Sequence, residues 1–166
     1  MAPWPAGSFA SRSLANMESV LQHIAHFIAR QTVASVCCSN AEGALHCFSC
    51  YYAYCEAQEM LYFKTSDDSL HMPWLYAQPY LAGTILPDKL NKLKVQGIQF
   101  RGVLLLGAEA DNKAAAKAYH LRYPFALAME GKVHSIRLDW IKMTDNTLGF
   151  GTKLVWDRIQ SAVPLR

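Results

Sequence analysis

The sequence predicts a β-dominated α+β fold, with an antiparallel barrel whose ends are covered by helices. Segments rich in aromatic and β-branched residues follow one another between turn signals, whereas helical periodicity is confined to a few stretches. With 166 residues, of which 52% are hydrophobic and 17% charged, the chain can bury a sizeable core as one domain.

The N-terminal stretch MAPWPAGSFASRSLAN lacks a continuous apolar run and precedes the first patterned segment. We therefore expect residues 1–16 to form a disordered leader and residues 17–166 to form the single domain. Because this stretch is a poor secretory signal, we expect the protein to be cytoplasmic, where disulfides are rare.

The first element is a helix that begins after a possible cap at Asn16 and ends at Arg30. His23 and His26 share one face of it, which we interpret as solvated surface. The apolar residues at helical spacing are Val20, Leu21, Ile24, Phe27 and Ile28.

Strands account for most of the remaining elements. Gly43 in the sequence NAEG gives the turn flexibility that predicts a hairpin between the first two strands. The expected strands are residues 31–39, 44–55, 59–66, 79–86 and 98–110, then one or two within 131–150 and a further candidate at 151–159.

Two shorter helices are expected between these strands. Residues 66–78 form a short helix capped by Ser66 or Asp67 and disturbed by Pro73. A second helix begins at Asp111 and ends before Pro124, and residues 87–97 form a basic connector.

All five cysteines lie between Cys37 and Cys55. Since successive strand residues face opposite sides, Cys47 and Cys50 cannot bind one metal together. Structural, apolar thiols are the favoured interpretation, ahead of a metal site or a reactive redox pair. No metal is expected.

The segment LYFKTSDDSLHMPWLYAQPYLAGTI, residues 61–85, resembles the FMN-binding split barrels related to pyridoxamine 5′-phosphate oxidase. The residues that carry the resemblance are Phe63, Thr65, Ser69, His71 and Pro79. The preceding hairpin and the later GIQFRG strand occur in the order typical of that superfamily. The tail IRLDWIKMTDNTLGFGTKLVW resembles that of a subgroup of short bacterial members without an assigned reaction.

The resemblance implies a six-stranded antiparallel split barrel that forms a homodimer and holds FMN in the cleft between subunits. The implied phosphate-binding residues are Lys64, Thr65, Ser66, Ser69 and His71. For the flavin ring edge they are Ser49, Tyr51, Gln99 and Arg101. Lys153, Trp156 and Arg158 would close the site from the second subunit. The implied activity is an FMN-dependent oxidoreductase acting on a small molecule.

The sequence departs from the flavin-binding members at one place, and this leaves other ligands possible. Flavin-binding members often carry Arg-Lys where this chain has Leu70 and His71, so a histidine that is partly charged at pH 7 would replace a fixed cation. A dimer that binds another ligand or none is the alternative, for example haem with His71 or His120 as the axial ligand.

Macromolecular and membrane partners are not expected from the sequence. Lys89, Lys92 and Lys94 form a small basic patch without stacking aromatics, which argues against nucleic acid. The chain has no apolar run of the roughly 18–20 residues that a membrane span needs.

Overall fold

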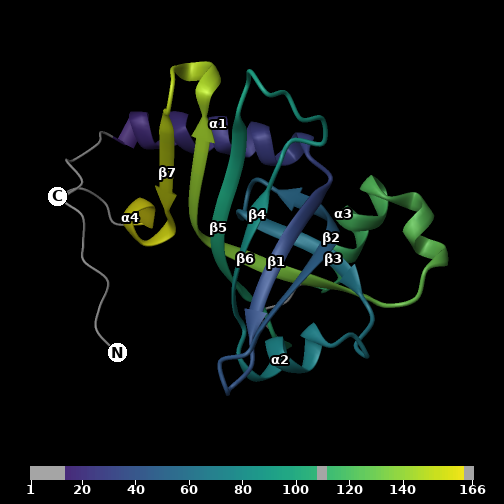
Figure 1. The fold of residues 1–166 in the computed structure, drawn as a ribbon. Coiled ribbons are helices and arrows are strands. Elements are labelled where there is room, and N and C mark those ends of the chain that lie inside the picture. The colour runs from purple at the N-terminus through teal and green to yellow at the C-terminus, as the bar shows by residue number, and fades with distance from the viewer. Residues whose placement is uncertain (1–13, 108–111, 163–166) are drawn as a thin grey trace.

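The computed structural model describes residues 14–107 and 112–162 (Figure 1). Its centre is an antiparallel sheet in the order β3-β2-β1-β4-β5-β6, which closes on itself because β3 also pairs with β6. The strands are β1 (Val33–Ser39), β2 (Leu45–Cys55), β3 (Met60–Thr65), β4 (Tyr80–Ile85), β5 (Gln96–Leu104), β6 (Lys132–Asp145) and β7 (Lys153–Asp157). The predicted six-stranded barrel is confirmed, with β7 as an additional strand paired to β6.

The segment 131–150 contains one long strand, β6, rather than two. Its first half pairs with β3 and its second half pairs with β7, so one strand both closes the barrel and extends the sheet. Strand β5 follows β6 along both halves, with a register shift between Arg101 and Gly102. Strand β5 ends at Leu104, earlier than the predicted 98–110.

Helices cover both ends of the barrel. The helices are α1 (Leu14–Arg30), α2 (His71–Ala77), α3 (Asn112–Arg122) and α4 (Arg158–Ala162), with short 3-10 helices η2 (Pro124–Ala128) and η3 (Asn146–Leu148). Helix α1 lies across one end, α2 lies at the opposite end, and α3 packs beside β2 and β3 (Figure 1). None of these helices is long and apolar enough to cross a membrane.

Helix α1 confirms the predicted apolar face but begins earlier than expected. Val20, Ile24, Phe27 and Ile28 are buried in the barrel core, as their spacing predicts. The helix starts at Leu14, so Asn16 lies inside it and is not its cap. Residues 14–16, expected in the leader, are therefore helical, whereas residues 1–13 lie outside the described part of the chain.

The predicted cap of α2 is wrong. The helix begins at His71, and Leu70 precedes it without a side-chain cap. Asp67 instead accepts a hydrogen bond from Tyr76 and forms an ion pair with Lys132 of β6. Pro73 lies in the first turn, where its missing N–H breaks no helical hydrogen bond. The expected start of α3 at Asp111 lies outside the described residues.

The thiol interpretation is wrong for one pair of cysteines. Cys37 and Cys47 lie directly opposite each other on β1 and β2 and form a disulfide. Cys38, Cys50 and Cys55 are free thiols, and Cys38 is buried in the core. The pairing follows from the hairpin register, which the spacing of cysteines alone does not reveal.

Candidate functional site

The barrel is split between β2 and β3. The two strands pair from Cys55–Met60 to Tyr52–Phe63, and beyond that pair they separate. A cavity of about 210 Å³ occupies the opening, lined on one side by β2 and on the other by the end of β3, His71 and the segment around η2. Beyond the pair Tyr52–Phe63, one edge of β2 therefore has no neighbouring strand, and this edge borders the cavity.

This cavity brings together several of the predicted site residues. Those that line it are Ser49, Tyr51, Lys64, Thr65 and His71. Ser69 adjoins them, since its hydroxyl oxygen lies 3.0 Å from Oγ1 of Thr65. Ser66 is exposed in the same loop, where its hydroxyl accepts a hydrogen bond from the Asp68 N–H.

Lys64 provides a positive charge in the cavity. Its ammonium group donates to the carbonyl oxygens of Ala126 and Met129, both at 2.7 Å. An ammonium group has three N–H donors, so one donor remains for a ligand. The contacts with η2 therefore hold the charge in place without neutralising it.

His71 is held as a neutral residue. It is buried, its Nε2 lies 3.0 Å from Thr65 Oγ1, and its ring stacks on Phe48 with ring centroids 3.7 Å apart. Burial, together with repulsion from His46 and His134, lowers the pKa of His71 to about 4. The structure therefore does not support His71 as a replacement cation at pH 7. It is instead a hydrogen-bond partner that positions Thr65.

Because the pKa of His71 is low, this residue should not contribute to the pH dependence of ligand affinity near neutral pH. If FMN binds in this cavity, wild type and His71→Gln should show the same change in FMN affinity between pH 6 and 8, because His71 is uncharged throughout that range. Titration of the FMN phosphate affects both proteins equally. Fluorescence titrations at each pH would measure this. An affinity that falls with rising pH in wild type alone would show that the imidazolium binds the ligand.

The open edge of β2 offers backbone groups to a ligand. The N–H of Tyr52 donates to Thr32, toward the β1 side. Since backbone groups of successive strand residues point in opposite directions, Ser49 and Tyr51 direct their N–H and C=O groups toward the split. Tyr51 is half exposed, and the centroid of its ring lies 6.2 Å from that of Phe125, which lines the same cavity.

A polar row crosses the outer face of the barrel beside the split. The strand registers align Ser49 of β2, Ser35 of β1, Thr84 of β4 and Gln99 of β5. The hydroxyl oxygens of Ser49 and Ser35 are 3.3 Å apart. Gln99 therefore lies in one row with Ser49, although it does not line the cavity in the split.

Arg101 belongs to a second, more open hollow of about 520 Å³ on the outer face of β1, β4, β5 and β6. Its guanidinium carbon lies 4.5 Å from the centroid of the Trp140 ring on the neighbouring strand. Ala82 and Cys37 also line this hollow.

The C-terminal candidates lie away from the split. Trp156 is buried in the barrel core, and Arg158 donates hydrogen bonds to the carbonyl oxygens of Leu138 and Gln58. Lys153 is exposed on β7. Within one protomer these three residues do not line either cavity, so their contribution to a second subunit's site stays a prediction.

Sequence reasoning missed the wall of the cavity formed by the segment after α3. Phe125, Ala126, Met129 and Glu130 line it from a 3-10 helix and the turn that follows. Their only visible signal was Pro124, which marks the end of α3 but not where the chain goes next.

Comparison with known proteins identifies relatives of similar length. The chain is 37% identical over 142 residues to a UPF0306 protein of Cronobacter sakazakii, covering 86% of this chain and 98% of that protein. It is 40% identical over 140 residues to the UPF0306 protein YhbP of Salmonella schwarzengrund, covering 83% and 93%. No protein-family model matches the chain.

Solved structures with low sequence identity share the fold. A haem-binding protein from Mycobacterium smegmatis superposes with a TM-score of 0.71 at 15% identity, covering 86% of this chain and 60% of that protein. A FAD-binding protein from Mesorhizobium loti has a TM-score of 0.59 at 14% identity, covering 74% and 91%. The chain thus shares its fold with a haem-binding protein and a FAD-binding protein.

Proposed function

We propose that this chain, which belongs to the UPF0306 family, is a flavoprotein that holds FMN in the split between β2 and β3. The observation that carries the proposal is the composition of the split. The open strand edge of β2 faces Lys64 and the Thr65 hydroxyl across one cavity, and the Ser69 hydroxyl adjoins that of Thr65.

The residues in the split fit the parts of FMN. The phosphate would be bound by the Lys64 ammonium group and the hydroxyls of Thr65 and Ser69, which supply charge and hydrogen bonds. The uracil-like edge of the ring needs alternating donors and acceptors, which the β2 edge at Ser49 and Tyr51 provides. When bound, the flavin would supply hydride or electron chemistry for a small-molecule substrate.

The proposed assembly is a homodimer with the cofactor between subunits. The cavity in the split encloses about 210 Å³, which is less than the roughly 300–1,000 Å³ of typical ligand pockets. The polar row that ends at Gln99 continues outward from this cavity on an open face. A second subunit placed against that face would complete the enclosure.

Haem is the second candidate, because a fold neighbour is described as a haem-binding protein. The two histidines considered as axial ligands, His71 and His120, do not favour it. The Nε2 of His71 is hydrogen-bonded to Thr65, and its ring face is covered by Phe48. His120 lies on α3 and lines neither cavity. The Nε2 of His71 is thus already engaged, and the buried Nε2 of His120, which has no hydrogen-bond partner among the described residues, belongs to a residue that lines neither cavity.

The direct test is a visible absorption spectrum of the purified protein before and after incubation with FMN and desalting. A bound-flavin spectrum near one equivalent per chain is expected. A Soret band in the protein as isolated would favour haem. A colourless protein that releases all added FMN would refute the flavoprotein proposal.

A single hydroxyl tests where the phosphate lies. We expect Ser69→Ala to weaken FMN binding by about 0.5–1.5 kcal/mol, the usual net contribution of one hydrogen bond. Fluorescence titration would measure it. Ser39→Ala is the matched control, since its hydroxyl bonds to Gln78 instead. Equal affinities in both variants would remove Ser69 from the site.

A further inference from the structure

The Cys37–Cys47 disulfide cross-links two strands that already pair with each other. It joins two residues separated by 10 positions in a hairpin whose strands already pair from Val33–Tyr51 to Ser39–Leu45. Cross-linking stabilises a protein mainly by restricting the unfolded chain, and the effect is smallest for short loops. A closed barrel of this size also needs no such cross-link. The disulfide is therefore not required to hold the two strands together.

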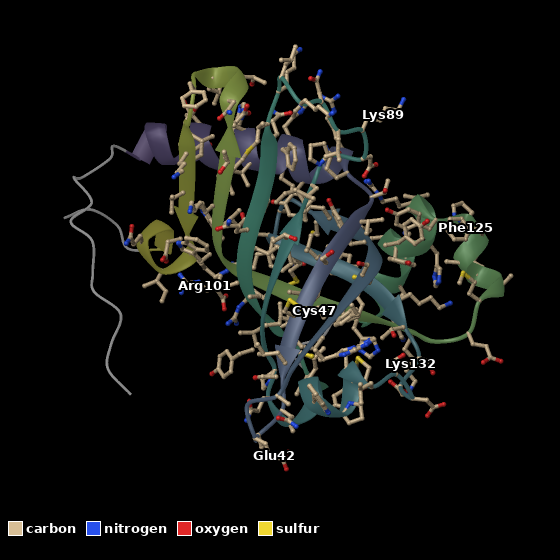
Figure 2. All side chains as sticks on the ribbon, viewed as in Figure 1. Glu42, Cys47, Lys89, Arg101, Phe125 and Lys132 are labelled. Atoms are coloured by element: carbon tan, nitrogen blue, oxygen red, sulfur yellow. A yellow bond between two sulfur atoms is a disulfide. The ribbon has the colours of Figure 1, made fainter. Side chains whose placement is uncertain are left out.

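The disulfide is accessible on the outer face of the barrel. Cys47 is exposed on β2, and Cys37 is half-buried and lines the hollow of about 520 Å³ (Figure 2). The strand registers align Cys47, Cys37, Ala82 and Arg101 in one row across β2, β1, β4 and β5. The small Ala82 side chain thus separates the disulfide from the guanidinium of Arg101.

This row provides a path for an attacking thiolate. Thiol–disulfide exchange proceeds by attack on one sulfur while the other leaves. Because the bond runs from β2 to β1, a thiolate that displaces the Cys47 sulfur approaches Cys37 from the side of β4, over Ala82 and through the hollow. The Arg101 charge attracts an anionic thiol to that side.

The acidic residues around the hollow are engaged elsewhere. The Asp139 carboxylate is 2.9 Å from Nε of Arg137 and 3.6 Å from Nε of Arg158. The Asp157 carboxylate accepts hydrogen bonds from the backbone N–H groups of Ile159 and Gln160. Arg101 is the one cation among the described residues that line the hollow, and its guanidinium lies over Trp140, on the β6 side of the row.

We propose that Cys37–Cys47 is a redox-active pair that is reduced by a low-molecular-weight anionic thiol attacking Cys37 through this hollow. The first thiolate forms a mixed disulfide with Cys37 and releases Cys47 as a thiolate. A second thiolate releases Cys37. The pair gains two electrons, the two thiols become one disulfide, and their protons are taken up by the cysteine thiolates. This activity does not depend on FMN binding.

Counting alkylated cysteines by mass spectrometry tests the proposal on the native protein. Air-oxidised protein, denatured after the reaction is stopped, should show the three cysteines that are free in the structure, and fully reduced protein should show all five. Incubation with glutathione should reduce the pair without denaturant. Reduction that requires urea would mark a purely structural disulfide, and five alkylated cysteines without reductant would show that no disulfide forms.

The rates at which three thiols reduce the disulfide, measured in wild type and three variants, show from which side the thiolate attacks. We expect glutathione to react about tenfold faster than the cationic thiol cysteamine, after correction for thiolate fraction. Arg101→Gln should remove this preference and leave neutral 2-mercaptoethanol within about twofold. Ala82→Leu should slow all three thiols about tenfold by filling the path, whereas Thr84→Leu, on the same face one row away, should not.

The position of glutathione in the mixed disulfide shows which of the two cysteine sulfurs is attacked. Peptide mapping of the trapped glutathione adduct should find it on Cys37. An adduct on Cys47, or equal rates in Ala82→Leu and Thr84→Leu, would overturn attack through the hollow.

Discussion

Replacing Lys64 with methionine is expected to weaken FMN binding by about 1.5–3 kcal/mol, roughly a 10- to 150-fold increase in Kd. Methionine retains most of the side-chain length but removes the charge. In the structure the Lys64 ammonium is held by the carbonyl oxygens of Ala126 and Met129, so the charge stays at the cavity when the ligand arrives. Little side-chain entropy is then lost on binding. Isothermal titration calorimetry with FMN would measure the change.

The control must separate lost charge from lost packing. Lys132→Met removes a lysine from the adjacent strand β6, where its ammonium is paired with Asp67 and lies outside the cavity. It should leave FMN affinity within about threefold. Because Lys64 also anchors η2, thermal unfolding of both variants should be compared. If Lys64→Met binds FMN as tightly as wild type, the phosphate does not lie in the split.

The parts of the fold that depend on local pattern could be predicted from the sequence. The apolar spacing from Val20 to Ile28 defines one helical face, and that face is buried. Gly43 marks a hairpin turn, and it has the positive φ of +84° that the turn requires. The start of α2 could not be predicted in this way. The partner of Asp67 is Lys132, which is 65 residues away, so no local pattern shows that Asp67 is unavailable as a cap.

In the candidate site, too, only the features that depend on local sequence could be predicted. Thr65, Ser69 and His71 are close in sequence, so the segment that contains them could be identified from its motif. The charge state of His71 could not be predicted from the sequence, because its low pKa depends on burial against Phe48, which lies on another strand. The Cys37–Cys47 disulfide likewise depends on the register of the hairpin, and a shift of one residue would move the two cysteines apart.

The largest loss of stability is expected at Asp145, the last residue of β6. Its carboxylate is fully buried and accepts hydrogen bonds from His23 at 2.8 Å and Gln96 at 2.9 Å, and from the Thr147 N–H and hydroxyl at 2.8 and 2.6 Å. It therefore ties α1, β5 and η3 to the end of β6, although the sequence had indicated that His23 was merely solvated. Asp145→Ala should lower the free energy of unfolding by about 3–5 kcal/mol, since it leaves several donors without an acceptor. Urea denaturation would measure it.

The pH dependence of the free energy of unfolding distinguishes the contribution of the Asp145 charge from that of its packing. Burial alone would raise the pKa of Asp145, but hydrogen bonds from Thr147, His23 and Gln96 outweigh it and lower the pKa to about 2. The carboxylate therefore stabilises the fold fully above its ordinary pKa of 3.8, and this contribution is lost as pH falls toward about 2. The stability gap between wild type and Asp145→Asn should narrow over that interval. Asp68→Ala, at an exposed carboxylate, should change stability by no more than about 0.5 kcal/mol. A gap that stays constant down to pH 2 would show that Asp145 acts through packing rather than through its charge.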